Sequence, residues 1–125
     1  MKKSTVIILV TLLSLLTSLS AFGATYTWIG TSGASWATST NWSPTRTTPA
    51  TSDVLQFNAG GAQSATAVPT QTIGQLIISA NTAVTLTSAA GTLTLSIGSG
   101  IAGTDLDVQS GSSLTLSNGG TAFTV

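Results

Sequence analysis

The sequence has 125 residues and very few charges. Lys and Arg together number 3, Asp and Glu together number 3, and His and Cys are absent, so charged residues make up 5% of the chain, against roughly 25% in ordinary soluble domains. With no His, Glu or Cys, the chain lacks the commonest catalytic bases, a thiol nucleophile and the nitrogen and sulfur ligands of transition metals, which excludes most enzyme classes.

Residues 1–24 follow the order of a secretory signal peptide. Lys2 and Lys3 precede an apolar run over 6–19, and small residues follow up to Gly23 and Ala24. The run is shorter than the roughly 20 apolar residues of a membrane-spanning helix, so we expect export, cleavage after Gly23 or Ala24, and membrane contact only through this leader. The mature chain then keeps Arg46 as its only cation. One cation cannot neutralise several phosphates, which excludes nucleic acid as a partner.

A Trp-rich segment occupies residues 25–71. It holds all three Trp (Trp28, Trp36 and Trp42), the only Tyr and all three Pro. The indoles have two interpretations: a platform for stacking sugars, or a packed cap in which large aromatic areas are buried. The cap is favoured, because no Glu, His or Lys lies nearby to orient a sugar. An alternating strand is predicted over 53–57 within this segment.

Residues 72–125 alternate between apolar and hydroxyl side chains, with Gly, Ser and Asn between the runs. A period of two places Leu, Val and Ile on one face of a strand and Thr or Ser on the other. No segment of the mature chain shows apolar residues at helical spacing. The fold class is therefore all-β, with strands predicted at 75–79, 83–87, 92–97, 105–108, 113–117 and 122–125.

The strands recur at short, regular intervals of roughly 8–12 residues, which fits a β-sandwich or barrel and equally a β-solenoid (parallel β-helix). The solenoid is favoured because an uncharged outer face suits stacked coils, in which repeated charges would repel one another. The sequence also ends inside a strand, Phe123-Thr124-Val125, without the polar cap that repeat proteins need. We expect 72–125 to be repeats truncated at their C-terminal end.

The spacing of the aromatic residues resembles that of a known group of proteins. Tyr26-Thr27-Trp28, Ser35-Trp36 and Asn41-Trp42, followed by Asp53-Val54-Leu55-Gln56-Phe57 and Thr72-Ile73-Gly74-Gln75-Leu76, resemble the start of large secreted bacterial β-helix surface proteins. The group includes adhesin-like proteins sorted by type IX secretion and autotransporter-associated β-strand repeat proteins. The resemblance implies a parallel β-helix at the cell surface with no known catalytic residues.

The few polar candidates for a site each have a simpler interpretation. Asp105 and Asp107 share one face of a strand, but Ca²⁺ needs six or more oxygen ligands, so solvated charges that discourage edge pairing are favoured. Asp53 is expected to end a turn or pair with Arg46. No Ser has a base to activate it. The sequence thus predicts no catalytic residue, no metal and no cofactor.

Three functions remain. The first is a secreted or cell-surface structural, adhesin-like β-solenoid module without catalytic activity, whose partners are a downstream part of a longer polypeptide or neighbouring surface proteins. The second is a carbohydrate-binding β module that contacts glycans through Trp28, Trp36 and Trp42. The third is the N-terminal part of a larger β-helix enzyme that degrades polysaccharides, with its catalytic residues further along the chain.

Overall fold

The computed structural model describes residues 23–89, 93–98, 102–117 and 123–124. The predicted signal peptide, 1–24, lies outside the described residues except for its last two. In the described part the regular structure is β strand apart from one 3₁₀ turn, η2 (Ser39–Asn41), so the all-β prediction is confirmed. The strands are β1 (Thr25–Trp28), β2 (Ala34–Ser35), β3 (Trp42–Ser43), β4 (Val54–Phe57), β5 (Gly61–Val68), β6 (Gln71–Ile73), β7 (Gln75–Ile78), β8 (Thr82–Ser88), β9 (Leu93–Ile97), β10 (Leu106–Val108), β11 (Ser113–Ser117) and β12 (Phe123–Thr124).

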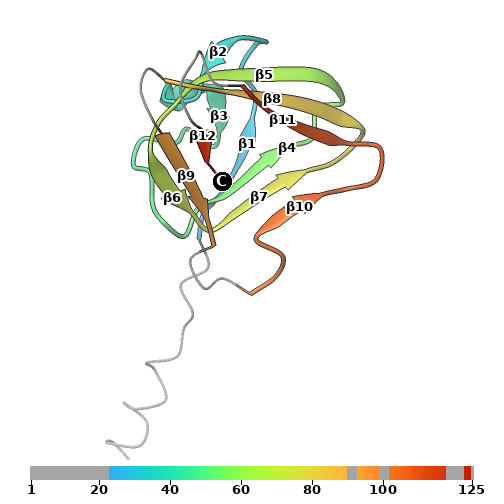
Figure 1. The fold of residues 1–125 in the computed structure, drawn as a ribbon. Coiled ribbons are helices and arrows are strands. Elements are labelled where there is room, and N and C mark those ends of the chain that lie inside the picture. Colours follow the sequence, from blue (N-terminus) through green and yellow to red (C-terminus); the bar gives the residue numbers. More distant parts are fainter. Residues whose placement is uncertain (1–22, 90–92, 99–101, 118–122, 125) are drawn as a thin grey trace, which may run out of the picture.

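The strands form three sheets, and from β4 onward each sheet takes every third strand. The first sheet has the order β10-β7-β4-β1-β3, the second β11-β8-β5-β2 and the third β12-β9-β6. Figure 1 shows β4, β7 and β10 side by side, and β5, β8 and β11 side by side next to them. Pairing within each sheet is parallel, except that β3 runs antiparallel to β1. We call three successive strands, one in each sheet, a round.

The register between the last two rounds is constant. Leu76 pairs with Leu106, Val84 with Leu114 and Thr94 with Thr124. The separation along the sequence is identical in these three pairs, so one repeat length holds in all three sheets. The preceding round is shorter, since Leu55 pairs with Leu76 and Ala62 with Ala83.

Alternation decides which side chains are buried. Val84 and Leu86 of β8 are 1% and 0% exposed, whereas Thr85 and Thr87 between and beside them are partly exposed. The period of two therefore places the aliphatic side chains between the sheets and the hydroxyl groups outside. The buried core consists of Trp28, Trp36, Trp42, Leu55, Phe57, Ala65, Val68, Ile73, Leu76, Ile78, Val84, Leu86 and Leu95.

The corner between the first and second sheets relies on left-handed backbone. Gly60 and Gly61 occupy it in one round, Ala80 and Asn81 in the next and Gly111 in the last, all with positive φ. The Thr82 hydroxyl joins two of these corners, because it donates to the carbonyl of Ser79 and accepts from the N–H of Gly60. Buried polar atoms at the turn are thereby satisfied.

The strands predicted from alternation at 53–57, 75–79, 83–87, 105–108 and 113–117 are confirmed to within two residues at each end as β4, β7, β8, β10 and β11. The strand β5 was not predicted. Its Ala- and Ser-rich sequence has weak β propensity, and parallel pairing with β8 and β2 holds it extended. The sheets also continue across residue 71, because β4 and β5 of the Trp-rich segment pair with β7 and β8.

Candidate functional site

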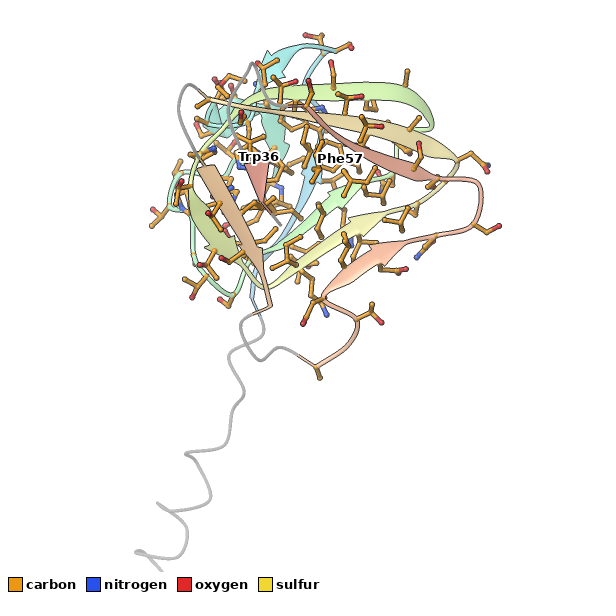
Figure 2. The ribbon with its side chains drawn as sticks, in the orientation of Figure 1. Trp36 and Phe57 are labelled. Carbon is orange, nitrogen blue, oxygen red and sulfur yellow. The ribbon has the colours of Figure 1, made fainter. Side chains whose placement is uncertain are left out.

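The three indoles and Phe57 form one buried cluster, which we call the Trp cluster. Trp28 lies on β1, Trp42 on β3 and Phe57 on β4, while Trp36 directly follows β2. The ring centroids of Trp28 and Trp42 are 5.0 Å apart, as are those of Trp36 and Trp42, and both pairs meet edge to face. Figure 2 shows Trp36 and Phe57 inside the strand stack. Their centroids are 6.2 Å apart.

Burial decides what the Trp cluster can do. Trp28, Trp36 and Trp42 are 2%, 1% and 1% exposed, so none of them presents a ring face to solvent. The Trp42 Nε1–H donates to the Trp36 carbonyl at 2.9 Å, which fixes one indole against the backbone of another. The arrangement therefore does not offer the sugar-stacking platform considered from the sequence. These residues pack the interior, and aromatic pairs in this geometry add about 0.5–1.5 kcal/mol each to the area they bury.

Asp53 pairs with Arg46, as one of its predicted interpretations stated. The Arg46 Nε–H donates to Asp53 Oδ2 at 2.7 Å, and the two side chains are 3% and 2% exposed. The N–H of Ala50 donates to the same carboxylate oxygen at 2.9 Å. A carboxylate engaged in this way joins the two ends of a loop.

The same ion pair connects the loop to the sheets. The Arg46 guanidinium lies over the Tyr26 and Trp42 rings, 5.8 and 5.9 Å from their centroids, at cation–π distance. The Asp53 carbonyl accepts from the N–H groups of Gly74 and Gln75 at 2.9 and 3.2 Å. Arg46 and Asp53 therefore join the Trp cluster to the start of the next round.

The remaining two carboxylates lie at the other end of the stack. Asp105 is exposed just before β10, and Asp107 is partly exposed and accepts from Gln109 Nε2 at 3.0 Å. Within the described ranges no group of three or more His, Cys, Asp or Glu residues could hold a metal ion. Asp105 thus lies beside an edge strand and Asp107 lies within it.

The last round leaves apolar side chains in contact with solvent. Leu106 and Val108 of β10 and Leu116 of β11 are 38%, 39% and 39% exposed. Their partners in the preceding strands, Leu76, Ile78 and Leu86, are fully buried. Because in-register neighbours lie on the same face of a parallel sheet, the three exposed side chains are on the core face. We call the outer sides of β10, β11 and β12 the open edge.

Comparisons with known proteins give no relative. No protein-family model matches the chain, and no curated protein or solved structure matches it. In the part of the chain that the structure describes, no helix is long and apolar enough to cross a membrane.

Proposed function

We propose that the chain is a structural module of an exported, cell-surface protein of the adhesin-like β-solenoid type, and that it works through its shape rather than through catalysis. One observation carries the proposal: strands follow each other through three sheets in a fixed order, and the last two rounds pair in parallel at one constant sequence separation in all three sheets. Coils that stack in this way bury a continuous core and present long, regular outer faces.

The pairing pattern favours a solenoid over the β-sandwich alternative. Sandwiches are built from antiparallel sheets whose neighbours are often joined by hairpins. Here β4, β7 and β10 pair in parallel, and the two strands that follow each of them lie in the other two sheets. Parallel neighbours separated by about one coil length are what a parallel β-helix requires.

The outer surface supports a structural role. On the second sheet, Ser64, Thr85 and Thr115 follow one another in register, and Thr87 pairs with Ser117. Columns of hydroxyl side chains can stack at the spacing of about 4.8 Å between strands without the repulsion that repeated charges would produce. Such a face can be extended by further coils, which suits a projecting stalk.

The charged residues support a non-catalytic module. Arg46 and Asp53 neutralise each other inside the protein, while Asp105 lies just before the edge strand β10 and Asp107 lies within it, and in the described ranges no group of three or more His, Cys, Asp or Glu could hold a metal ion. The proposal keeps a further part of a longer polypeptide, or neighbouring surface proteins, as the partners, and the N-terminal leader as the route of export. The burial of the indoles removes the observation on which a carbohydrate-binding module depended.

A register-specific disulfide tests the stacked architecture. Thr85 and Thr115 are in-register neighbours on the outer face, about 4.8 Å apart between Cα atoms, which lies within the range of about 4.4–6.8 Å that a disulfide spans. The double variant Thr85→Cys/Thr115→Cys should therefore cross-link within one chain. The control is Thr87→Cys/Ser113→Cys, whose positions lie at opposite ends of the paired strands and should stay reduced. Equal cross-linking of both pairs would contradict the stacking.

Localisation is tested separately. A bacterial host expressing the chain with its own leader should export it, and antibody should detect it in the medium or on intact cells. A variant with Lys2 and Lys3 changed to Asp is the control, because a signal peptide needs its positive start. Retention of the unmodified chain in the cytoplasm would contradict the proposed location while leaving the architecture untouched.

A further inference from the structure

The junction between the predicted leader and the first strand belongs to the fold. Gly23 and Ala24 are the last two residues of the predicted leader, and β1 begins directly after them at Thr25. Thr25 pairs with Val54 of β4, and the Val54 N–H donates to the Ala24 carbonyl at 2.9 Å. The pairing of the first sheet therefore reaches the residues between which we expect the leader to be cut.

Gly23 packs against the loop that precedes β4. A Cβ at this position would overlap the carbonyl of Ser52, so the backbone of the loop fills the space beside the Gly23 Cα. Signal peptides have small residues just before the cut, and an enzyme that selects such a residue must enclose its Cα. In the folded chain Ser52 thus occupies the space that the enzyme needs at Gly23.

The buried ion pair holds this loop in place. The Arg46 Nε–H and the Ala50 N–H both donate to Asp53 Oδ2, at 2.7 and 2.9 Å. The Asp53 N–H in turn donates to the Ala50 carbonyl at 3.2 Å. Ser52 directly precedes Asp53, so its carbonyl is fixed between the buried carboxylate and the start of β4. Asp53 is therefore a positioning residue for the contact at Gly23.

The exposure of the neighbouring side chains does not make the peptide bonds accessible. Ala24 and Thr25 are exposed, but hydrolysis adds water across the bond and leaves a carboxylate and an amino group. The enzyme must reach the carbonyl carbon with its nucleophile and bind the carbonyl oxygen as an oxyanion. Cleavage after Gly23 needs the space that Ser52 occupies. Cleavage after Ala24 acts on the carbonyl that accepts from Val54.

We propose that folding of the N-terminal end closes the cleavage junction, so that the leader is removed only while β1 is separated from β4 and from the loop over 46–53. The inference rests on the proposed leader, but not on the solenoid type or the adhesive role. Removal of the leader then precedes closure of the first sheet, and a chain that folds first keeps its leader. Trp28 ends β1 and belongs to the Trp cluster, so the cluster also closes after cleavage.

The first test compares the folded precursor, which is the full chain with its leader, with a peptide that cannot form the contact. The peptide, residues 1–40, carries the same junction but lacks the loop and β4. Purified bacterial signal peptidase in detergent micelles should cut the peptide about tenfold or more faster than the refolded precursor. Cleavage of a paired strand follows its open fraction, and each hydrogen bond that must open lowers this fraction by about two- to tenfold. Mass spectrometry measures the released leader.

The two ways to fail are distinguishable. If the peptidase does not cut the peptide after residue 23 or 24, the proposed leader is wrong and the inference falls with it. If it cuts the peptide and the precursor at equal rates, while circular dichroism shows the precursor to be folded, the leader stands and only the closed junction is overturned.

Two substitutions of similar expected cost in stability separate the loop from overall stability. Asp53→Ala removes the carboxylate that holds Ser52 in place and should speed cleavage of the folded precursor about two- to tenfold. Leu86→Ala removes a buried side chain of β8 in the second sheet and should change the rate by less than about twofold, because local opening of the first sheet does not involve it. Circular dichroism checks that each variant is folded. Equal acceleration by both would assign cleavage to global unfolding and overturn the positioning role of Asp53.

Discussion

The two ends of the strand stack differ in how they meet solvent. At the N-terminal end, four aromatic rings and a buried ion pair fill the interior, and the first and second sheets finish in strands of two residues. At the C-terminal end, β11 has five residues and the core-facing Leu106, Val108 and Leu116 are each more than a third exposed. Both ends belong to the same first and second sheets, and the contrast lies in their side chains, in strand length and in the antiparallel pairing of β3 with β1. Local stability should therefore be concentrated at the N-terminal end.

Among the substitutions that test this contrast, removal of the central indole should lower the free energy of unfolding most. Trp42 contacts Trp28, Trp36 and Phe57 edge to face and is 1% exposed. Trp42→Ala should lower the free energy of unfolding by about 3–5 kcal/mol, because it leaves a large cavity. Urea denaturation followed by tryptophan fluorescence and circular dichroism measures the loss.

The control for this variant lies near the same end of the stack but outside the core. Ile29 is 61% exposed, so Ile29→Ala should change the free energy of unfolding by no more than about 0.5 kcal/mol. A similar small change for Trp42→Ala would show that the Trp cluster does not stabilise this end.

Breaking the ion pair should have the next largest effect. Asp53→Ala leaves the Arg46 guanidinium buried without its carboxylate partner, and loss of one member of a buried pair costs about 3–5 kcal/mol. We expect a value near the lower limit, about 3 kcal/mol, because Arg46 also keeps its contacts with the Tyr26 and Trp42 rings. Thermal and urea unfolding measure it.

A double variant separates the charge from the packing. Arg46→Met/Asp53→Leu replaces both charges with apolar side chains, and such replacements are often neutral or stabilising. It should therefore be more stable than Asp53→Ala. A double variant as unstable as the single one would assign the loss to the Ala50 hydrogen bond and loop packing instead of the unpaired guanidinium.

Substitution of two leucines that are partners in register compares how much the interior and the open edge each contribute to stability. Leu86 and Leu116 are partners on the core face of β8 and β11, at 0% and 39% exposed. Leu86→Ala should lower the free energy of unfolding by about 3 kcal/mol and Leu116→Ala by about 1 kcal/mol, because only the first leaves an enclosed cavity. Both are measured by urea denaturation at low protein concentration. Equal losses would mean that Leu116 is covered in solution.

These comparisons also show what the sequence can predict. The strands β8 and β11 follow from alternation of apolar and hydroxyl residues, and β7 follows from a short apolar run, Leu76-Ile77-Ile78. The strand β5 does not, since its sequence Gly-Ala-Gln-Ser-Ala-Thr-Ala-Val has no large apolar residue before Val68. Its extended backbone depends on neighbours supplied by β8 and β2, and such non-local pairing leaves no local pattern.

The polar contacts are predictable to different degrees. The pairing of Asp53 with Arg46 could be predicted, because Arg46 is the only Lys or Arg outside the predicted leader and Asp53 is the acidic residue nearest to it in the sequence. The sequence favours enclosure of the indoles over a sugar platform, but it does not identify Phe57 as the fourth ring of the Trp cluster, because this residue comes from a later strand.

The smallest expected change in stability depends on which residue comes first after the predicted leader is removed. The sequence allows cleavage after Gly23 or Ala24, and the two products differ by one residue. The Val54 N–H donates to the Ala24 carbonyl at 2.9 Å, at the start of the pairing between β1 and β4. A chain that starts at Ala24 keeps this hydrogen bond, which is worth about 0.5–1.5 kcal/mol, whereas a chain that starts at Thr25 loses it.

We therefore expect Ala24 to be the first residue of the exported protein. Cleavage after Gly23 also leaves Ala21 and Gly23 as the small residues before the cut, which suits the preference for small residues at such sites. Intact-mass spectrometry of the exported chain identifies the terminus, and comparison of chains made to begin at Ala24 and Thr25 should show the first to be more stable by about 1 kcal/mol. An exported chain that begins at Thr25 would mean that the first sheet starts without this bond, and that the N-terminal end depends on the Trp cluster and the ion pair alone.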